Sequence, residues 1–437
     1  MFLEVHNQER FRIRRHPDNV PLPEFLLRDS EMTEDRNANV QEAIVSSDQR
    51  SRINVWKILT AAVFAASFLL SLMLGSVAVA ASYGHDGTRD FIEYWAAAQQ
   101  LVHGHNPYDP AGSWKLEQAA GSRFPVVMMN PPLIMCLIAP LGFLDNVNAA
   151  RFWLMLQLLC FGASVWIICN LFRKQAALFI LFLGFCFAPV HICILIGQIG
   201  IFLLLGIALF LALHEKRPFL AGVVLLPCAM KPHLFLPFGI VLLFWIIGRR
   251  SYRILAGFLV SLVLAVGVAY WFDPKVWAQW SEYVRVTQPA NSPTWNLSRV
   301  GRIMVGFDNH AWVQFMPVLA ASVWACWYFW NHRDRWNWLK QGSLLLLVSV
   351  VCAPYSWLTD EALLLPCLIA GIEEAQDSGR TLLPLALAMA VALFQFVRGD
   401  WIQTPALVWT APAWLAFYLY ATRKPKEISA PTAEAQA

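Results

Sequence analysis

The chain has 437 residues, of which 58% are hydrophobic and only 14% are charged, and its formal net charge is +4. Soluble domains carry about 25% charged residues, so this composition indicates a protein that has lipid as its main solvent. The basic residues are scattered between apolar stretches and form no basic stripe, which argues against nucleic acid as a partner. The sequence also lacks the phosphate loop, the dinucleotide fingerprint and the zinc-protease and serine-hydrolase motifs.

Residues 1–52 differ in kind from the rest, because they are rich in Arg, Glu, Asp and Asn and hold no long apolar period. Such a segment cannot bury enough apolar surface to fold alone. We predict a cytoplasmic disordered tail for 1–52, a transmembrane catalytic domain for 53–425 and a second cytoplasmic disordered tail for 426–437. The first apolar run starts near Val55, too late and too long for a signal peptide.

A helix needs about 20 apolar residues to cross the hydrocarbon of a bilayer. The predicted spans are Val55–Ser82, Ala149–Phe172, Gln175–Ile196, Gly200–Leu213, Arg253–Phe272, Trp312–Trp330, Ser343–Leu358, Leu382–Val397 and Ala406–Ala421. Residues 217–249 are predicted as a hairpin of two shorter helices that turns at Lys231-Pro232-His233, and Glu361–Ile372 as a short, tilted or broken span.

Lys and Arg are enriched in cytoplasmic loops, so the basic loops of this chain are assigned to the inside together with both termini. The loops at 83–148 and 273–311 are then external. The fold class is an all-α polytopic membrane protein of about twelve spans, with a helical first external loop and a long external loop near 273–311. The apolar segment Met128–Leu144 is short, and counting it as a span would reverse every later basic loop. Asn130-Pro131-Pro132 near its start favours a re-entrant or surface-lying helix, with a full span as the alternative.

An acid-bearing segment follows the first span and begins at Asp90 and Glu93. Ionisable clusters at a membrane edge are functional-site hypotheses by default. A helix over 91–102 would place both acids on one face, one turn apart. The structural alternative is that Asp90 only caps this helix and that Glu93 completes a capping box. The nearby histidines, His85, His103 and His105, have no standard zinc spacing, so we expect neither a metal nor another cofactor.

Several motifs occur in an order that is similar to glycosyltransferase family 87, a family of GT-C membrane enzymes. Asp90-Phe91 with Tyr94, followed by Asn106-Pro107-Tyr108-Asp109, resembles the family's first-loop signature. The later marks are Asn130-Pro131-Pro132-Leu133, Gly197-Gln198, Lys231-Pro232, Asn296-Leu297-Ser298 and the stretch from Ala353 to Asp360. Together they cover roughly 85–425. The resemblance implies a GT-C-like fold and inverting transfer of a sugar, by family precedent mannose, from a polyprenyl-phosphate donor.

The resemblance also implies roles for single residues. Asp90 takes the position of the general base, and Glu93 is the runner-up as base or acceptor-positioning group. A departing phosphate needs Lys, Arg or His on the outer side, and Lys231, at an external turn between apolar helices, is the first candidate. The other predicted substrate-binding residues are Tyr94, His233, Asn296, Ser298, Arg299, Arg302, Tyr355 and Asp360. Relatives often carry a His near Asp360, where this chain offers Tyr355 and Trp357.

The implied partners are the lipid donor, a lipid or glycan acceptor and membrane lipids, with the active site on the external side of the plasma membrane. Two alternatives stay open. A secondary transporter would be expected to show repeated halves with matched broken helices, which the sequence does not show convincingly. A lipid-linked polymerase or ligase would be expected to carry its key external loop late in the chain.

Overall fold

The computed structural model describes residues 55–71, 73, 90–126, 128–172, 177–287, 295–307, 310–398 and 405–423. Within these ranges every regular element is a helix, as predicted, and no strand occurs. Lys57–Ala437 form one compact unit, and the description below concerns that unit. The predicted tails, 1–52 and 426–437, lie outside the described residues.

The unit contains long helices, short helices and several 3-10 turns. The first half comprises an apolar helix Val55–Ser71, α2 Phe91–Val102, α3 Pro110–Ala119, η1 Pro132–Ile134, α4 Met135–Ile138, η2 Ala139–Phe143, α5 Asn146–Leu171, α6 Ala177–Cys186, α7 Ala188–Ile196 and α8 Gly200–Leu213. The middle comprises α9 Pro218–Val223, α10 Leu226–Ala229, η3 Pro232–Leu234, α11 Leu236–Arg249, α12 Tyr252–Phe272, α13 Val276–Thr287 and α14 Leu297–Met304. The last part comprises η5 Ala311–Phe315, α15 Met316–His332, η6 Arg333–Arg335, α16 Gln341–Val351, η7 Leu358–Leu364, α17 Leu365–Asp377, α18 Leu383–Val397, η8 Pro405–Leu407 and α19 Thr410–Thr422.

Three helices in the described ranges are long and apolar enough to cross a bilayer, namely α5, α12 and the continuous helix Ala311–Arg335. All three fall on predicted spans, and α8 has the predicted bounds. The other apolar helices have 10 to 17 residues. A helix of 14 residues is about 21 Å long, shorter than the hydrocarbon thickness of about 30 Å. The predicted count of about twelve spans is therefore not matched by twelve full-length helices.

Proline explains much of this shortening. The predicted span Gln175–Ile196 is not one continuous helix, because α6 and α7 meet at Phe187 with a bend of 72°. Pro189 occupies the first turn of α7, where its missing N–H group costs nothing but ends the preceding helix. Proline lies in the first turn of α9, α10 and α11 in the same way.

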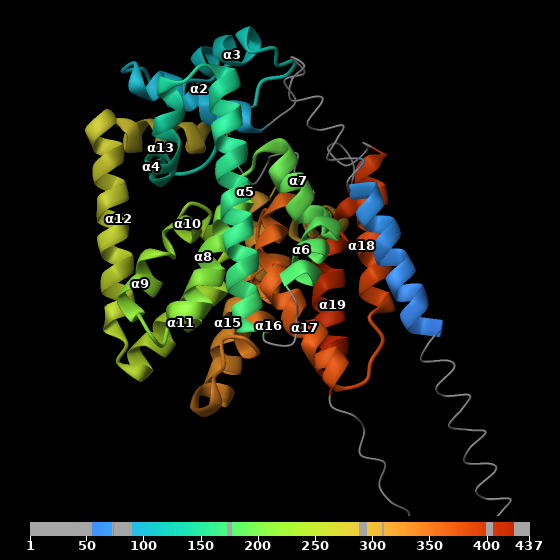
Figure 1. The fold of residues 1–437 in the computed structure, drawn as a ribbon. Coiled ribbons are helices and arrows are strands. Elements are labelled where there is room, and N and C mark those ends of the chain that lie inside the picture. The colour runs from blue at the N-terminus through green and yellow to red at the C-terminus, as the bar shows by residue number, and fades with distance from the viewer. Residues whose placement is uncertain are drawn as a thin grey trace, which may run out of the picture. The chain divides into compact units, whose positions relative to one another are not determined.

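The segment Met128–Leu144 folds as η1, α4 and η2, and the 12 residues Pro132–Phe143 are too short to cross the bilayer as a helix. These short helices pack against α2. The side-chain nitrogens of Trp95 and Gln99 both donate to the carbonyl of Leu144, at 3.0 and 2.9 Å. Figure 1 shows α2, α3, α4 and α13 gathered at one end of the long helices α5 and α12.

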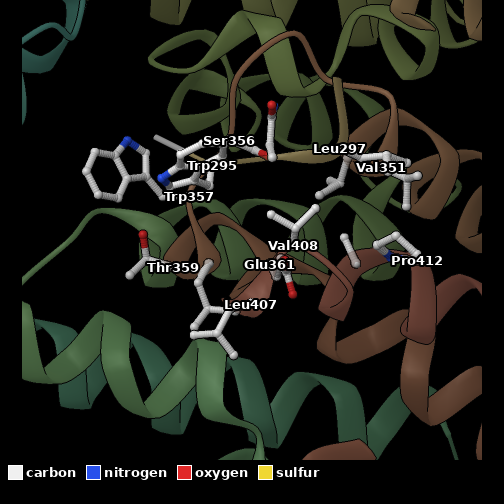
Figure 2. A pocket seen from close by; sticks show the side chains of 14 residues that line it. Trp295, Leu297, Val351, Ser356, Trp357, Thr359, Glu361, Leu407, Val408 and Pro412 are labelled. Atoms are coloured by element: carbon white, nitrogen blue, oxygen red, sulfur yellow. The ribbon is translucent and has the colours of Figure 1, made fainter. Parts of the chain in front are cut away.

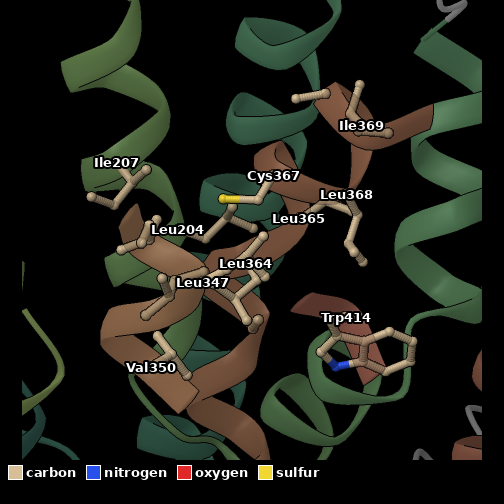
Figure 3. Close-up of a cluster of buried hydrophobic side chains, with 14 of the residues drawn as sticks. Leu204, Ile207, Leu347, Val350, Leu364, Leu365, Cys367, Leu368, Ile369 and Trp414 are labelled. Atoms are coloured by element: carbon tan, nitrogen blue, oxygen red, sulfur yellow. The ribbon is translucent and has the colours of Figure 1, made fainter. Parts of the chain in front are cut away.

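Two groups of buried apolar side chains support this arrangement. One lies among α2, the segment 132–141, the first part of α5 and the last part of α12. The larger one joins α6, α7, α8, α11, α16, η7, α17 and α19, and Figure 3 shows part of it around Leu204, Leu347, Leu365 and Trp414. Large apolar side chains also cover the outer surface, such as Trp271 on α12 with 86% exposure. An apolar surface of this kind suits contact with lipid.

Candidate active site

Asp90 lies at the junction where the first-loop segment turns into α2. Its backbone is helical, and its side chain makes no capping hydrogen bond to α2. The alternative that Asp90 only caps this helix is therefore wrong. Its carboxylate instead accepts a hydrogen bond from Nε2 of Gln198, with 2.8 Å between Nε2 and Oδ2. Asp90 remains partly exposed, so a substrate hydroxyl can reach it.

Gln198 lies in the turn between α7 and α8, and α5 fixes its backbone. Nε1 of Trp153 donates to the Gly197 carbonyl at 2.7 Å, and Nε2 of Gln157 donates to the Gln198 carbonyl at 2.7 Å. Gly197 has φ +81°, and a Cβ atom there would lie 2.6 Å from Cβ of Phe91. Only glycine combines this left-handed backbone with such a close approach to the start of α2, so the turn brings Gln198 beside Asp90.

The amide oxygen of Gln198 connects Asp90 to two further groups. It accepts a hydrogen bond from the hydroxyl of Tyr94 at 2.8 Å and another from Nζ of Lys231 at 3.4 Å. Tyr94 is fully buried and Lys231 is 7% exposed. Lys231 lies in the turn between α10 and η3, where the sequence predicted a hairpin turn, and its ammonium points into the protein.

Lys231 also forms a buried ion pair, because its Nζ lies 2.5 Å from Oδ1 of Asp360. Asp360 is 1% exposed, and its Oδ2 accepts the backbone N–H of Trp357 at 2.9 Å. Asp360 thus both lies in the first turn of η7 and binds the lysine. A side chain on Gly200 would collide with the Thr359 carbonyl, so glycine at the start of α8 allows η7 to approach.

Asp90, Gln198, Lys231 and Asp360 therefore form one chain of polar contacts, here called the polar network, with Tyr94 attached. Desolvation raises the pKa of Asp90 above its ordinary value. The hydrogen bond from Gln198 and the charge of Lys231 act against this rise, while Asp360 adds to it. Desolvation, and then the charge of Asp90, hold the pKa of Glu93 well above its ordinary value. Asp90 is the less buried of the two acids, and its pKa is raised less strongly than that of Glu93, which makes it the better candidate for the proton acceptor.

The late predicted residues form a second group around α14. Asn296 caps α14 by accepting the N–H of Arg299 at 2.9 Å, and its Nδ2 donates to the Ala353 carbonyl at 3.1 Å. Ser298 and Arg302 are 4% and 5% exposed, and within the part of the chain that the structure describes the Ser298 hydroxyl and two guanidinium nitrogens of Arg302 have no hydrogen-bond partner. Buried unpaired donors are costly, so these two side chains are suited to an anionic or hydroxyl-bearing ligand.

The remaining predicted residues, His233, Tyr355 and Arg299, each take part in a contact with an aromatic ring. The His233 ring lies on the Tyr355 ring with 4.0 Å between centroids, which joins the Lys231 turn to the stretch before Asp360. The guanidinium carbon of Arg299 lies 4.9 Å from the centre of the Trp295 ring. In the described ranges no three His, Cys, Asp or Glu side chains are grouped to hold a metal ion; His85 lies outside those ranges.

Several of these residues fall in a region of the chain that matches a known protein family. The model of glycosyltransferase family 87 matches residues 129–354, just over half of the 437-residue chain. The chain belongs to glycosyltransferase family 87. It is a membrane glycosyltransferase, and the suspected family is confirmed. No curated protein and no solved structure matches the chain. The leading alternative, a secondary transporter, is a different class of protein from this family.

The part of this glycosyltransferase that matches the family includes Gln198, Lys231 and α14, whereas Asp90 and Asp360 lie outside it. The sequence motifs named the Gly197-Gln198 turn but gave Gln198 no role. The signal that could have pointed to Gln198 is that it is a polar residue between two apolar segments. The pairing of Lys231 with Asp360 had no signal, since 129 residues separate them.

Proposed function

We propose that this glycosyltransferase moves one sugar, with mannose as the first candidate, from a polyprenyl-phosphate donor to a hydroxyl of a lipid or glycan acceptor, with inversion at the anomeric carbon. The reaction takes place on the external side of the plasma membrane. The single observation that carries the proposal is the polar network, in which an accessible carboxylate and a buried ammonium flank one glutamine amide.

In the proposed reaction Asp90 takes the proton of the acceptor hydroxyl while the acceptor oxygen attacks the anomeric carbon. The bond between that carbon and the phosphate oxygen breaks, and the phosphate leaves with the electron pair. General-base assistance contributes a factor of about 10²–10⁴ in rate. An ammonium has three donors, and two in Lys231 point to Gln198 and Asp360. The third can donate to a departing phosphate.

An apolar groove beside the network supports a lipid-linked donor. Its lining comes from α10, α11 and α12 and includes Cys228, Pro232, Phe235, Leu243 and Phe258, with about 500 Å³ of free space. Pro232, which lines the groove, directly follows Lys231 of the network in the chain. An isoprenoid phosphate has this distribution of properties, because an apolar chain ends in an anion.

The test is a transfer assay with the purified full-length chain in liposomes, a panel of radiolabelled polyprenyl-phosphate sugars and membrane extracts as acceptor. We expect radiolabel to move from one member of the panel into acceptor. Failure with every polyprenyl-phosphate sugar, together with transfer from a nucleotide sugar, would refute the lipid donor. A product that retains the anomeric configuration would refute inversion.

The pH dependence gives a second prediction. Asp90 must be deprotonated to act as base, and its pKa is raised, so kcat/KM should fall on acidification at a higher pH than an ordinary aspartate would give. Replacing Lys231 with Met removes a charge that lowers this pKa and should move the acid limb to higher pH. Replacing Asp360 with Asn removes a charge that raises it and should move the limb to lower pH. Shifts of the same sign in both variants would contradict this electrostatic scheme.

A further inference from the structure

A second cavity lies beside η7, next to Thr359 and Glu361. It is lined by Trp295, Asn296, Leu297, Val350, Val351, Ser356, Trp357, Leu358, Thr359, Glu361, Leu407, Val408, Ala411 and Pro412. Figure 2 shows the labelled side chains around this space, with Trp295, Ser356 and Trp357 close together. None of Asp90, Gln198 and Lys231 belongs to its lining, so it is separate from the polar network.

The cavity combines aromatic, apolar and polar groups that suit a sugar ring. Indole rings can stack on the apolar face of a pyranose, and Trp357 is 38% exposed while Arg299 packs on Trp295. Glu361 is 6% exposed. Its two carboxyl oxygens accept hydrogen bonds from the Thr410 hydroxyl at 2.8 Å and the Trp414 indole at 2.7 Å. The oxygens of a carboxyl group have further hydrogen-bonding capacity beside these two bonds, so Glu361 can also bind sugar hydroxyls.

An unpaired hydroxyl gives independent evidence for a ligand. Thr359 is 2% exposed and lines the cavity, yet its hydroxyl oxygen has no hydrogen-bond partner among the described residues. Leaving a buried hydroxyl unpaired is unfavourable, and a ligand hydroxyl would pair with it. The cavity volume is about 50 Å³. A cavity of this size holds a few water-sized groups at about 10–15 Å³ each, which suits one edge of a sugar ring.

We propose that this cavity binds a hexopyranose unit of the acceptor glycan, at a position next to the sugar that is glycosylated. This inference rests on the proposed function in one respect, since it takes the acceptor to be a glycan. Asp360 and Glu361 are consecutive, but Asp360 points to Lys231 and Glu361 to Trp414, so η7 separates the cavity from the reacting centre. A polyprenyl-phosphate sugar carries its transferred sugar beside its phosphate. A sugar bound across η7 therefore belongs to the acceptor.

The direct test measures the binding of three glycosides to the full-length chain in detergent by saturation-transfer NMR. The glycosides are methyl α-mannoside, methyl α-glucoside and methyl α-galactoside. We expect at least one glycoside to bind, and Trp357→Ala and Glu361→Gln each to weaken it about tenfold. The matched control is Trp327→Ala, which removes an indole of 62% exposure on α15 and should bind as the unchanged chain does. Asp90→Asn should also bind normally, because Asp90 does not line the cavity.

Kinetics separate the acceptor from the donor. In Trp357→Ala we expect the KM for acceptor to rise about tenfold, with the KM for donor and the kcat at saturating acceptor unchanged. An equal rise in the KM for donor would assign the cavity to the donor and overturn the proposal. Unchanged glycoside binding in both variants would overturn it as well. Glycoside binding that depends on Trp357, in a chain that uses no polyprenyl-phosphate sugar, would uphold the cavity and refute only the proposed donor.

Discussion

The Asp90→Asn variant is expected to bind the lipid donor like the unchanged chain but to transfer sugar about 10²–10⁴ times more slowly. The asparagine amide has the same shape, and its oxygen can accept the hydrogen bond that Gln198 now donates to the carboxylate. The fold and the polar network should therefore persist, while the group that accepts the acceptor proton is gone. The measurement is kcat and KM in the liposome assay, with donor binding measured separately.

Two controls make this result specific. Asp109→Asn makes the same charge change in the same loop, but Asp109 caps α3, and Asn is an equally good cap, so transfer should stay within about twofold of the unchanged chain. Glu93→Gln tests the runner-up base. If Asp90→Asn retains full transfer while Glu93→Gln loses it, the roles of the two acids are the reverse of those proposed here.

The sequence predicted helices best where the apolar run was long and uninterrupted. The hydropathy of α5, α12 and the helix Ala311–Arg335 was sufficient, because in lipid a helix is the simplest way to pair every backbone group. Prediction failed at α6 and α7, where an apolar run conceals a bend of 72°. Hydropathy measures composition and is insensitive to such a break, although Pro189 in the run was a local sign of it.

The candidate site was predictable only in part. Asp90, Lys231 and Asp360 stood out as charges at the ends of apolar segments, but the sequence could not show which charges meet. In the sequence Asp90 has the pattern of a helix cap. In the structure its carboxylate instead accepts a hydrogen bond from Gln198, which is 108 residues away in the chain. Local patterns predict local hydrogen bonds, whereas these long-range contacts depend on the packing of α5, α7 and α8 around the Gly197 turn.

The second large effect is expected at the Lys231–Asp360 pair. Both side chains are buried, at 8% and 1% exposure. Removing one member of a buried ion pair leaves the other charge uncompensated and costs about 3–5 kcal/mol. Lys231→Met and Asp360→Asn should therefore each lower the melting temperature of the purified protein clearly. The double variant, which removes both charges, should regain most of this loss. A double variant as unstable as the sum of the two single variants would show that the pair is not coupled.

Transfer activity should behave differently from stability, and this difference distinguishes a catalytic lysine from a structural one. In Asp360→Asn the ammonium is kept, and Gln198 remains a hydrogen-bond acceptor for it, so a phosphate can still be bound once the protein is folded. In Lys231→Met and in the double variant the cation is absent, and charge-assisted bonds to phosphate are lost. We expect the double variant to be stable but to bind donor weakly and transfer slowly. A stable double variant with normal transfer would limit Lys231 to holding η7 in place.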